Sequence, residues 1–205
     1  MSELFTTNAQ RASYGIGRQM GDQLAPNRFE GLDPKAVAAG VLDALEGNES
    51  AVAAADLEAA FREISAKIQA QEAEKAKVHA AEGETFLAEN AKKDGVTVLE
   101  SGLQYEVITE GSGEKPTVNS TVRTHYHGTL INGDVFDSSV QRGQPAEFPV
   151  GGVIKGWTEA LQLMPVGSKW RLYIPYNLAY GERGAGGAIG PYQALVFEVE
   201  LLDIL

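Results

Sequence analysis

One long segment without helix-breaking residues constrains the fold of this chain more than any other feature of its sequence. Residues 56–93 contain no proline, and Gly83 is their only glycine. Such a run is typical of one continuous helix, which Gly95 would end. At 1.5 Å per residue, ~38 residues span about 55–60 Å, which is too long for one compact domain to cover. The segment therefore predicts a rod that links two parts of the chain.

The apolar residues of this rod are unevenly distributed. Its first third carries Leu57, Phe61, Ile64 and Ile68 at spacings of four, three and four, a heptad-like seam that fits another helix. In residues 69–77 the only apolar side chains are alanines, which predicts a solvated middle. Larger apolar residues return near the end of the rod, where a second domain can rest against it.

Composition differs sharply between the two halves. Residues 101–205 hold 15 of the 23 glycines, six of the eight prolines and both tryptophans. A shift of this kind usually marks a domain boundary. We predict an α+β protein with an all-helical N-terminal dimerisation domain at 1–55 and a long linking helix at 56–95. A C-terminal antiparallel sheet wrapped around a short helix is expected at 96–205.

The N-terminal region predicts a dimer. Asn8–Leu24 has good helix formers but interior glycines, each costing about 0.5–1 kcal/mol relative to alanine. Close approach by another helix would offset that cost, and a frayed, irregular helix is the alternative. Asp33-Pro34 begins a second helix. About 65 residues form only a marginal core alone, so a homodimer is the economical interpretation. The predicted interface residues are Tyr14, Gly17, Gly21, Leu57, Phe61, Ile64 and Ile68.

Charge and composition narrow the classes of function. The formal charge of −11 repels phosphate backbones and anionic lipid, so we expect no nucleic-acid partner and no membrane association. The absence of cysteine excludes disulfides and thiol catalysis. No stretch approaches the roughly 18 apolar residues that a membrane helix needs. Residues 1–8 have neither the basic nor the apolar part of a secretory signal, and the expected location is the cytoplasm.

The second half has the periodicity of strands. Three segments alternate between apolar and polar residues: 122–126, 170–174 and 195–201. Asn132-Gly133 predicts a hairpin with a type I′ turn, and residues 156–164 predict one short helix.

Residue types in this half offer little reactive chemistry. His125 and His127 lie two apart on a predicted strand and can in principle hold a metal, but no third ligand is spaced to help. A pair of histidines on a sheet face is the commoner arrangement. Residues 181–190 are glycine-rich but lack the ending of a phosphate loop, so we interpret them as a flexible surface loop. Aromatic and aliphatic residues near turns favour an apolar pocket, and neither cofactor nor metal is expected.

Six short motifs follow one another in the second half. They are His125-Tyr126-His127-Gly128, Val135-Phe136-Asp137-Ser138-Ser139, Gly152-Val153-Ile154-Lys155-Gly156-Trp157, Met164-Pro165-Val166-Gly167, Ala179-Tyr180-Gly181 and Leu195-Val196-Phe197-Glu198-Val199-Glu200-Leu201. This series resembles the FKBP-type peptidyl-prolyl cis-trans isomerase domain over roughly residues 97–205.

The helical half is similar to the N-terminal region of bacterial FKBPs of the macrophage infectivity potentiator type. The shared features are Tyr14-Gly15-Ile16-Gly17, the helix begun by Asp33-Pro34 and the long linking helix. The resemblance implies a homodimer in which a long helix joins the dimerisation and catalytic domains. It also implies an isomerase that acts on X-Pro bonds of unfolded or partly folded proteins.

The same resemblance implies roles for individual residues. Asp137, Tyr180 and Tyr126 are the implied catalytic residues, with Asp137 at the pocket rim. Trp157 would form the floor of the pocket. The Ile154 N–H and the Tyr180 hydroxyl would hold substrate carbonyls by hydrogen bonds. The implied residues that bind substrate or macrolides are Phe136, Val153, Ile154, Trp157, Phe197 and Arg142, the last by steadying Asp137 and Tyr126.

Four positions depart from the family pattern. Ala146 stands at an aromatic position, Ala185 and Ala188 replace larger residues over the pocket mouth, and Gly190 stands where proline is frequent. The implied ligands are tacrolimus- and rapamycin-type macrolides, and these departures affect how tightly such ligands bind. A second class of function also fits the residues, namely a dimeric binding module or chaperone whose isomerase activity is incidental.

Overall fold

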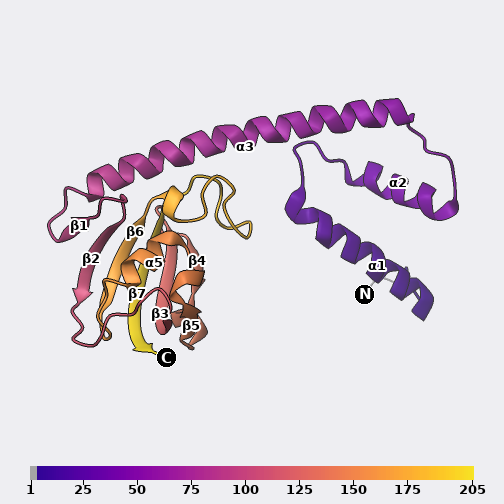
Figure 1. Cartoon of the computed structure of the whole chain (residues 1–205). Helices are drawn as coiled ribbons and strands as arrows, with labels where there is room; N and C mark the ends of the chain where they lie inside the picture. The colour runs from indigo at the N-terminus through magenta and orange to yellow at the C-terminus, as the bar shows by residue number, and fades with distance from the viewer. Residues whose placement is uncertain (1–3) are drawn as a thin grey trace. The chain divides into compact units, whose positions relative to one another are not determined.

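The structure is a computed structural model that describes residues 4–205, the side chain of Asn27 excepted (Figure 1). Helix α1 spans Asn8–Leu24 and begins with a capping box between Thr7 and Gln10. Helix α2 spans Pro34–Glu46, where Asp33 accepts a hydrogen bond from the Lys35 N–H at 2.8 Å and Gly47 ends the helix. A short 3₁₀ helix, η1, occupies Ala25–Asn27. The predicted starts of both helices are confirmed.

Helix α3 spans Ala54–Asn90 as one continuous helix of 37 residues. It ends three residues before the predicted end, because the N–H groups of Lys92 and Lys93 bond to carbonyls three residues back and tighten the chain into a turn. The chain divides into two compact units between Ala70 and Gln71, inside this helix. The predicted functional segments at 1–55, 56–95 and 96–205 stay a prediction, since compactness does not test what each segment does.

The helical unit, up to Ala70, leaves its apolar residues uncovered. No residue of α1 or α2 is buried. On α3 the Phe61 side chain is 69% exposed, and Leu57 and Ile68 are exposed as well. A methyl group built at Gly17 or Gly21 would touch nothing within 4 Å. The close helix contact expected at these glycines is therefore not made within the described part of the chain.

The second unit, from Gln71, contains the sheet. Its strands are β1 (Val96–Val98), β2 (Gln104–Thr109), β3 (Thr121–Leu130), β4 (Val135–Ser138), β5 (Ala146–Pro149), β6 (Lys169–Ile174) and β7 (Leu195–Ile204). The order is β1-β2-β6-β7-β3-β4, with β5 also paired to β3, and every pairing is antiparallel. The helices are α4 (Ser139–Arg142) and α5 (Lys155–Leu161), with 3₁₀ turns η2 (Val150–Gly152) and η3 (Tyr176–Leu178).

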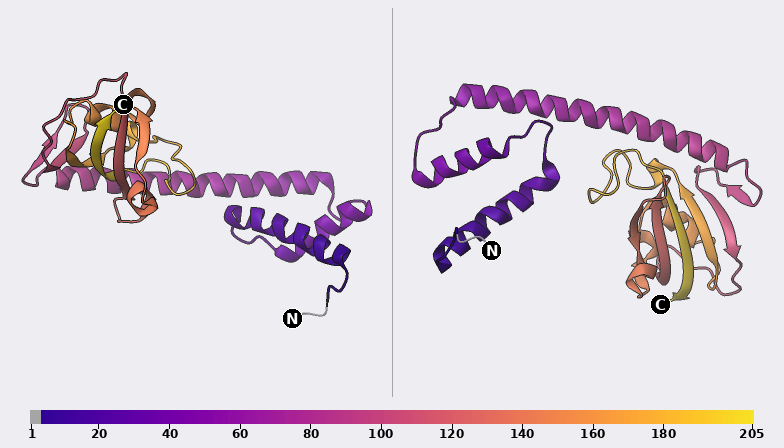
Figure 2. Two further views of the ribbon diagram at one scale, coloured as in Figure 1. Left: turned by 90° about the horizontal axis from the view of Figure 1, so that it is seen from below. Right: turned by 180° about the vertical axis from the view of Figure 1, so that it is seen from behind.

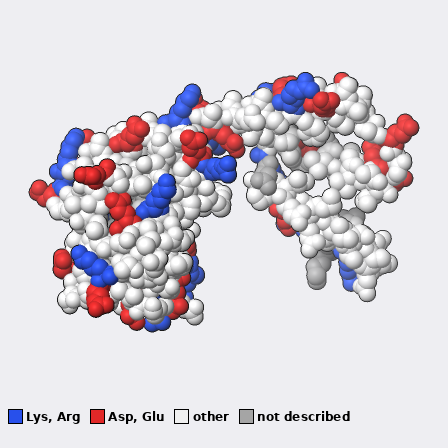
Figure 3. Space-filling model, in the orientation of Figure 1, with Lys and Arg blue, Asp and Glu red and all other residues white. Residues whose placement is uncertain are grey.

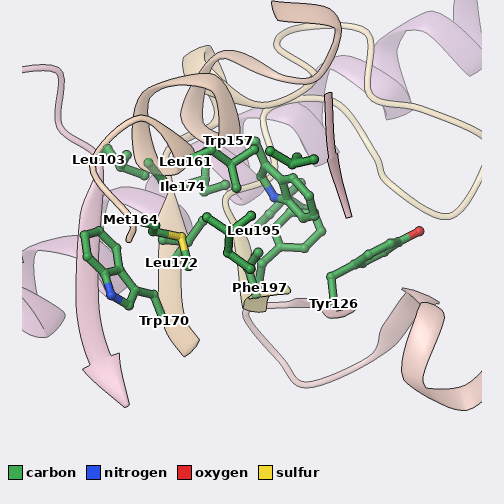
Figure 4. Close-up of a cluster of buried hydrophobic side chains, with 14 of the residues drawn as sticks. Leu103, Tyr126, Trp157, Leu161, Met164, Trp170, Leu172, Ile174, Leu195 and Phe197 are labelled. Atoms are coloured by element: carbon green, nitrogen blue, oxygen red, sulfur yellow. The ribbon is translucent and has the colours of Figure 1, made fainter. Parts of the chain in front are cut away.

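The core lies between the sheet and α5, which the sheet curves around (Figure 2). Along β7 buried and partly buried residues alternate, as predicted, so that Leu195, Phe197, Val199 and Leu201 face inward. Figure 4 shows part of this cluster with Trp157 of α5 against Phe197. The α+β class and the sheet around a short helix are thus confirmed.

The hairpin between β3 and β4 forms, but its turn is not the predicted type I′. Such a turn needs a positive φ at both central residues, whereas only Gly133 has one, at 92°. The Asn132 side chain instead accepts a hydrogen bond from the Asp134 N–H at 3.0 Å. This local bond stabilises a longer four-residue connection in which Asn132 keeps a negative φ.

Charged residues of both signs are interspersed over the face in Figure 3. Along α3 most of the ion pairs are three or four residues apart and well exposed, as between Arg62 and Glu58 or Lys67 and Glu63. Exposed pairs of this kind stabilise a helix only slightly. Among the described residues, no helix has both the length and the apolar character needed to cross a membrane.

Candidate functional site

A cavity of about 510 Å³ lies in the second unit, beside α5 and strands β3, β4, β5 and β7. Every residue predicted to line the pocket borders it. Among the described residues, those that line the cavity are Tyr126, Phe136, Asp137, Phe148, Gly152, Val153, Ile154, Trp157, Tyr180, Ala185, Gly186, Ala188, Ile189 and Phe197. Arg142 stands behind this lining and contacts two of its members.

Trp157 forms the floor of the cavity, with only 4% of its surface exposed. The rings of Tyr126, Phe148 and Phe197 meet it nearly edge-on, at centroid distances of 5.4, 5.7 and 5.2 Å. Edge-to-face contacts are the favoured geometry of aromatic pairs. The indole Nε1 is buried and has no hydrogen-bond partner in residues 4–205. The floor is thus closely packed and apolar, and the indole N–H is a donor without a partner among the described residues.

Two glycines allow the rings and the helix to come this close. A methyl group at Gly128 of β3 would lie 2.7 Å from the rings of Phe136 and Phe197. A methyl group at Gly156 of α5 would lie 2.6 Å from a methyl of Ile174. Any larger residue at either position would therefore push apart the elements that shape the cavity.

The polar rim is a network of three side chains. Arg142 donates one hydrogen bond to the Asp137 carboxylate and another, of 2.9 Å, to the Tyr126 hydroxyl. The Tyr126 hydroxyl in turn donates to the other oxygen of Asp137. Figure 4 shows this hydroxyl pointing away from the apolar cluster. Arg142 is held in place as the last residue of α4, which Ser138 caps and Gly143 ends with a φ of 70°.

This network sets the charge state of the rim. Burial alone would raise the pKa of Asp137, but the hydrogen bonds from Tyr126 and Arg142 and the Arg142 charge hold that pKa below its ordinary value. Burial and the Asp137 charge raise the pKa of Tyr180. At neutral pH the rim therefore presents an ionised carboxylate beside a protonated phenol. The Tyr180 hydroxyl makes no hydrogen bond within residues 4–205, so it is free to donate.

Ile154 brings a second donor to the cavity. It is the N-cap residue of α5, with φ −59° and ψ 149°, and its carbonyl accepts hydrogen bonds from Trp157 and Thr158. An N-cap N–H lies outside the helix ladder and is available to a ligand. Its position beside the Trp157 floor agrees with the role that the sequence predicts for it.

Two large lining residues, Phe148 and Ile189, were missed in the sequence. Phe148 belongs to β5, two residues after Ala146 and therefore on the same side of the strand. It pairs with Val122 of β3, and its ring supplies the aromatic wall that Ala146 lacks. The alternation in β5 was the available signal, but a run of four residues that follows one proline and ends in another gives a weak strand pattern.

The glycine-rich segment 181–190 is not only a surface loop, which corrects the prediction. Its glycines at 181, 184, 186 and 187 have positive φ and turn the chain back on itself. Ala185 and Ile189 exchange two backbone hydrogen bonds, of 2.8 and 3.1 Å. This arc brings Ile189 into the core, at 7% exposure, and makes it a wall of the cavity.

The two strand histidines each have a hydroxyl partner. His125 Nδ1 lies 3.1 Å from Ser139 Oγ, and His127 Nδ1 lies 3.0 Å from Ser138 Oγ. Both therefore take part in joining β3 to the segment that carries Asp137.

Comparison with known proteins gives consistent relationships over the whole chain. Residues 112–202 match the family model described as FKBP-type peptidyl-prolyl cis-trans isomerase, and residues 9–107 match the domain amino terminal to it. The "FKBP-type 22 kDa peptidyl-prolyl cis-trans isomerase" of Escherichia coli is 57% identical over 98% of both chains. The "Outer membrane protein MIP" of Legionella longbeachae is 41% identical over 97% of this chain and 87% of its own. The crystal structure of FkpA from Escherichia coli superimposes with a TM-score of 0.72 at 36% identity, over 98% of both chains.

Proposed function

The chain belongs to the FKBP-type peptidyl-prolyl cis-trans isomerases, and on that premise we propose that the 510 Å³ cavity takes up the proline of its substrates. The enzyme interconverts the cis and trans forms of X-Pro peptide bonds. The observation that carries the assignment of the cavity is its Trp157 floor, enclosed by aromatic rings and bordered by one fixed carboxylate. A proline ring is apolar and compact, which suits such a floor.

An apolar cavity lowers the barrier through the electronic structure of the amide. Rotation about the peptide bond faces ~18–20 kcal/mol because resonance gives the C–N bond double-bond character. This resonance separates charge, so water favours it and an apolar cavity weakens it. The planar ground state is thereby destabilised relative to the twisted transition state. No covalent step is needed.

Polar groups at the rim then act on the rotating carbonyl. The Ile154 N–H and the Tyr180 hydroxyl donate to substrate carbonyls next to the proline and hold the backbone while one side of the bond turns. The ionised Asp137 carboxylate is fixed by Tyr126 and Arg142. As the carbonyl turns, its dipole changes direction relative to this charge. Only an interaction that changes between ground state and transition state accelerates the reaction.

The Tyr180→Phe variant tests the first of these contacts. It removes one unpartnered hydroxyl and keeps the ring in the lining. One neutral hydrogen bond corresponds to about a fivefold loss of kcat/KM for a short X-Pro peptide. Thermal unfolding should stay at the wild-type midpoint. A wild-type kcat/KM in this variant would mean that the Tyr180 hydroxyl does not contribute a hydrogen bond to the reaction.

A pH profile tests the rim network. Because the folded-state pKa of Asp137 is depressed, the carboxylate stabilises the fold above its unfolded pKa, and this contribution is lost as pH falls through the folded pKa. Wild-type kcat/KM should hold until pH falls below the ordinary aspartate value of about 3.9. In Arg142→Gln the pKa of Asp137 rises, so the acid limb of the profile should move to higher pH. If the acid limb lay at the same pH in both proteins, the proposed coupling between Arg142 and Asp137 would be contradicted.

We also propose that the enzyme is a homodimer through its helical unit and binds unfolded clients in a chaperone-like way. The uncovered apolar faces of α1 and α2, the exposed Phe61 and an apolar cavity of about 300 Å³ between α1 and α2 support this assembly. Such faces are costly in a free chain, and a second copy would cover them. Two catalytic units in one assembly can then hold one unfolded chain at two prolines.

Two further expectations stay predictions. We propose that tacrolimus- and rapamycin-type macrolides occupy the same cavity, with fewer contacts where Ala185 and Ala188 form its wall. Competition between macrolide and peptide in the isomerase assay tests this. The cytoplasmic location is tested by fractionating cells that express the untagged protein.

A further inference from the structure

We infer that His79 of α3 is a positioning residue for the substrate cavity, acting through residues 181–192, here called the pocket loop. This inference rests on the proposed use of the cavity for proline. The pocket loop contributes Ala185, Gly186, Ala188 and Ile189 to the cavity wall. His79 contacts Gly190 and Pro191, here called the stem, through which the loop leads into β7. The long helix therefore influences how a peptide is held.

The end of α3 is firmly attached to the second unit. Gly83 is buried, and a methyl group there would lie 3.2 Å from the Cβ of Ala194, the residue before β7. The buried Asn90 side chain donates to the Gln104 side-chain oxygen at 3.0 Å, and Gln104 donates back to the Leu87 carbonyl at 2.9 Å. Figures 1 and 2 show the pocket loop beside the second half of α3. His79 thus acts from a fixed point.

The contact of His79 with the loop stem is directional. Its Nδ1 lies 3.0 Å from the carbonyl oxygen of Pro191. A carbonyl only accepts, so Nδ1 carries the hydrogen and donates. The ring also lies over Gly190, where a Cβ would come within 3.0 Å of His79 Cε1. The histidine holds both residues of the stem, one by a hydrogen bond and one by packing.

The pocket loop transmits this contact because its ends and its tip are closed. Tyr192 donates its N–H to the Gly181 carbonyl at 3.0 Å, which joins the two ends. Tyr192 has a φ of 58°, and no other non-glycine residue in 4–205 has a positive φ. Such a conformation persists only where the surroundings impose it. The Tyr176 ring, 5.0 Å from that of Tyr192, and the contacts at Pro191 are those surroundings.

A shift of the stem would move the wall without touching the floor or the rim. Ala185 and Ala188 are small, so their contacts with a substrate are van der Waals contacts that weaken within a fraction of an ångström. Trp157 and Asp137 come from α5 and β4, which His79 does not contact through any described bond. We therefore expect that loss of the His79 hydrogen bond changes KM and the preference for the residue before proline, while kcat changes little.

Full-length His79→Ala and His79→Asn test this inference. Asparagine can place an amide N–H where His79 Nδ1 stands, whereas alanine cannot. We expect His79→Ala to raise KM about three- to tenfold, as the loss of one hydrogen bond allows, and to change the ratio of kcat/KM between Ala-Pro and Leu-Pro peptides. His79→Asn should restore most of both. Lys77→Gln, at a side chain 77% exposed on the same helix, is the matched control and should behave as wild type.

A double-mutant cycle with Gly190 gives an independent readout. Gly190→Ala alone presses on the His79 ring and should raise KM, but in the His79→Ala background the space is free. The double variant should therefore be no worse than His79→Ala. An unchanged KM and peptide preference in His79→Ala, failure of His79→Asn to restore them, or additive effects with Gly190→Ala would each overturn the inference. Tyr180→Phe and Asp137→Ala are assayed in parallel, because wild-type activity in both would point to failure of the cavity assignment instead.

Discussion

Replacing Asp137 by alanine is expected to lower kcat/KM for a short X-Pro peptide by about 10- to 100-fold, since hydrogen bonds that involve a charged group contribute about 1.5–3 kcal/mol. Among the residues that the structure describes, this carboxylate is the only charged group that lines the cavity. Its loss removes the fixed charge beside the rotating carbonyl and frees Tyr126 and Arg142 from their common partner. Stopped-flow isomerisation assays at neutral pH measure this effect.

Two companion variants make the result specific. Asp137→Asn keeps a side-chain oxygen that can accept from Tyr126 but loses the charge, so it should fall between wild type and alanine if charge matters. Asp203→Ala makes the same chemical change at an exposed carboxylate of β7 that does not line the cavity. It should leave kcat/KM unchanged. Equal activity of all four proteins would mean that the rim carboxylate plays no part in isomerisation.

Local sequence rules recovered the elements whose stabilising contacts are themselves local. The helix start at Asp33 and the alternation along β7 each depend on contacts within a few residues, and each is found where expected. The exception is Asn132, where two local rules compete. An Asn-Gly pair permits a type I′ turn, but the asparagine side chain bonds to the Asp134 N–H and selects another conformation.

Residue patterns alone do not predict which residues meet in the cavity. The spacing of residues 126, 137, 154, 157 and 180 does not reveal that they meet, because β3, β4, α5 and the segment after η3 must first pack against one another. The order of six motifs, by resemblance to a family, brought them together instead. The resemblance covers only the positions that belong to the family pattern. It therefore missed Phe148, which forms the wall near the departure at Ala146, and Ile189, which the glycine-rich loop carries into the core.

Disrupting the helical seam with Phe61→Glu and Ile64→Glu is expected to produce the second large effect, on assembly and on protein substrates. Both residues lie on the seam of α3, where Phe61 is exposed in a single chain. Burying two carboxylates in an apolar interface is strongly unfavourable, so the variant should be monomeric at micromolar concentration. Sedimentation equilibrium or light scattering gives the mass. Ala59→Glu with Ala66→Glu, two exposed positions off the seam, is the matched control and should stay dimeric.

The consequence for activity depends on the substrate. A short peptide reaches one cavity only, and the cavity lies wholly in the second unit, so kcat/KM on peptide should stay within about twofold of wild type in the monomeric variant. An unfolded protein can engage both cavities of a dimer. Once one is occupied, binding at the other becomes intramolecular, with an effective concentration that reaches the order of mM for a suitable span.

Proline-limited refolding of a protein client should therefore separate the two forms where a peptide does not. Per catalytic unit, the dimer should accelerate refolding by about 10- to 100-fold more than the monomeric variant at low enzyme concentration, since linking two sites raises avidity without any new contact. The advantage should shrink as enzyme concentration approaches that needed for one cavity to bind alone. If the monomer matched the dimer on protein clients throughout this range, the helical unit would assemble the enzyme without adding to its action on clients. If the wild-type chain itself had a monomer's mass at micromolar concentration, the uncovered seam of α3 would require another partner.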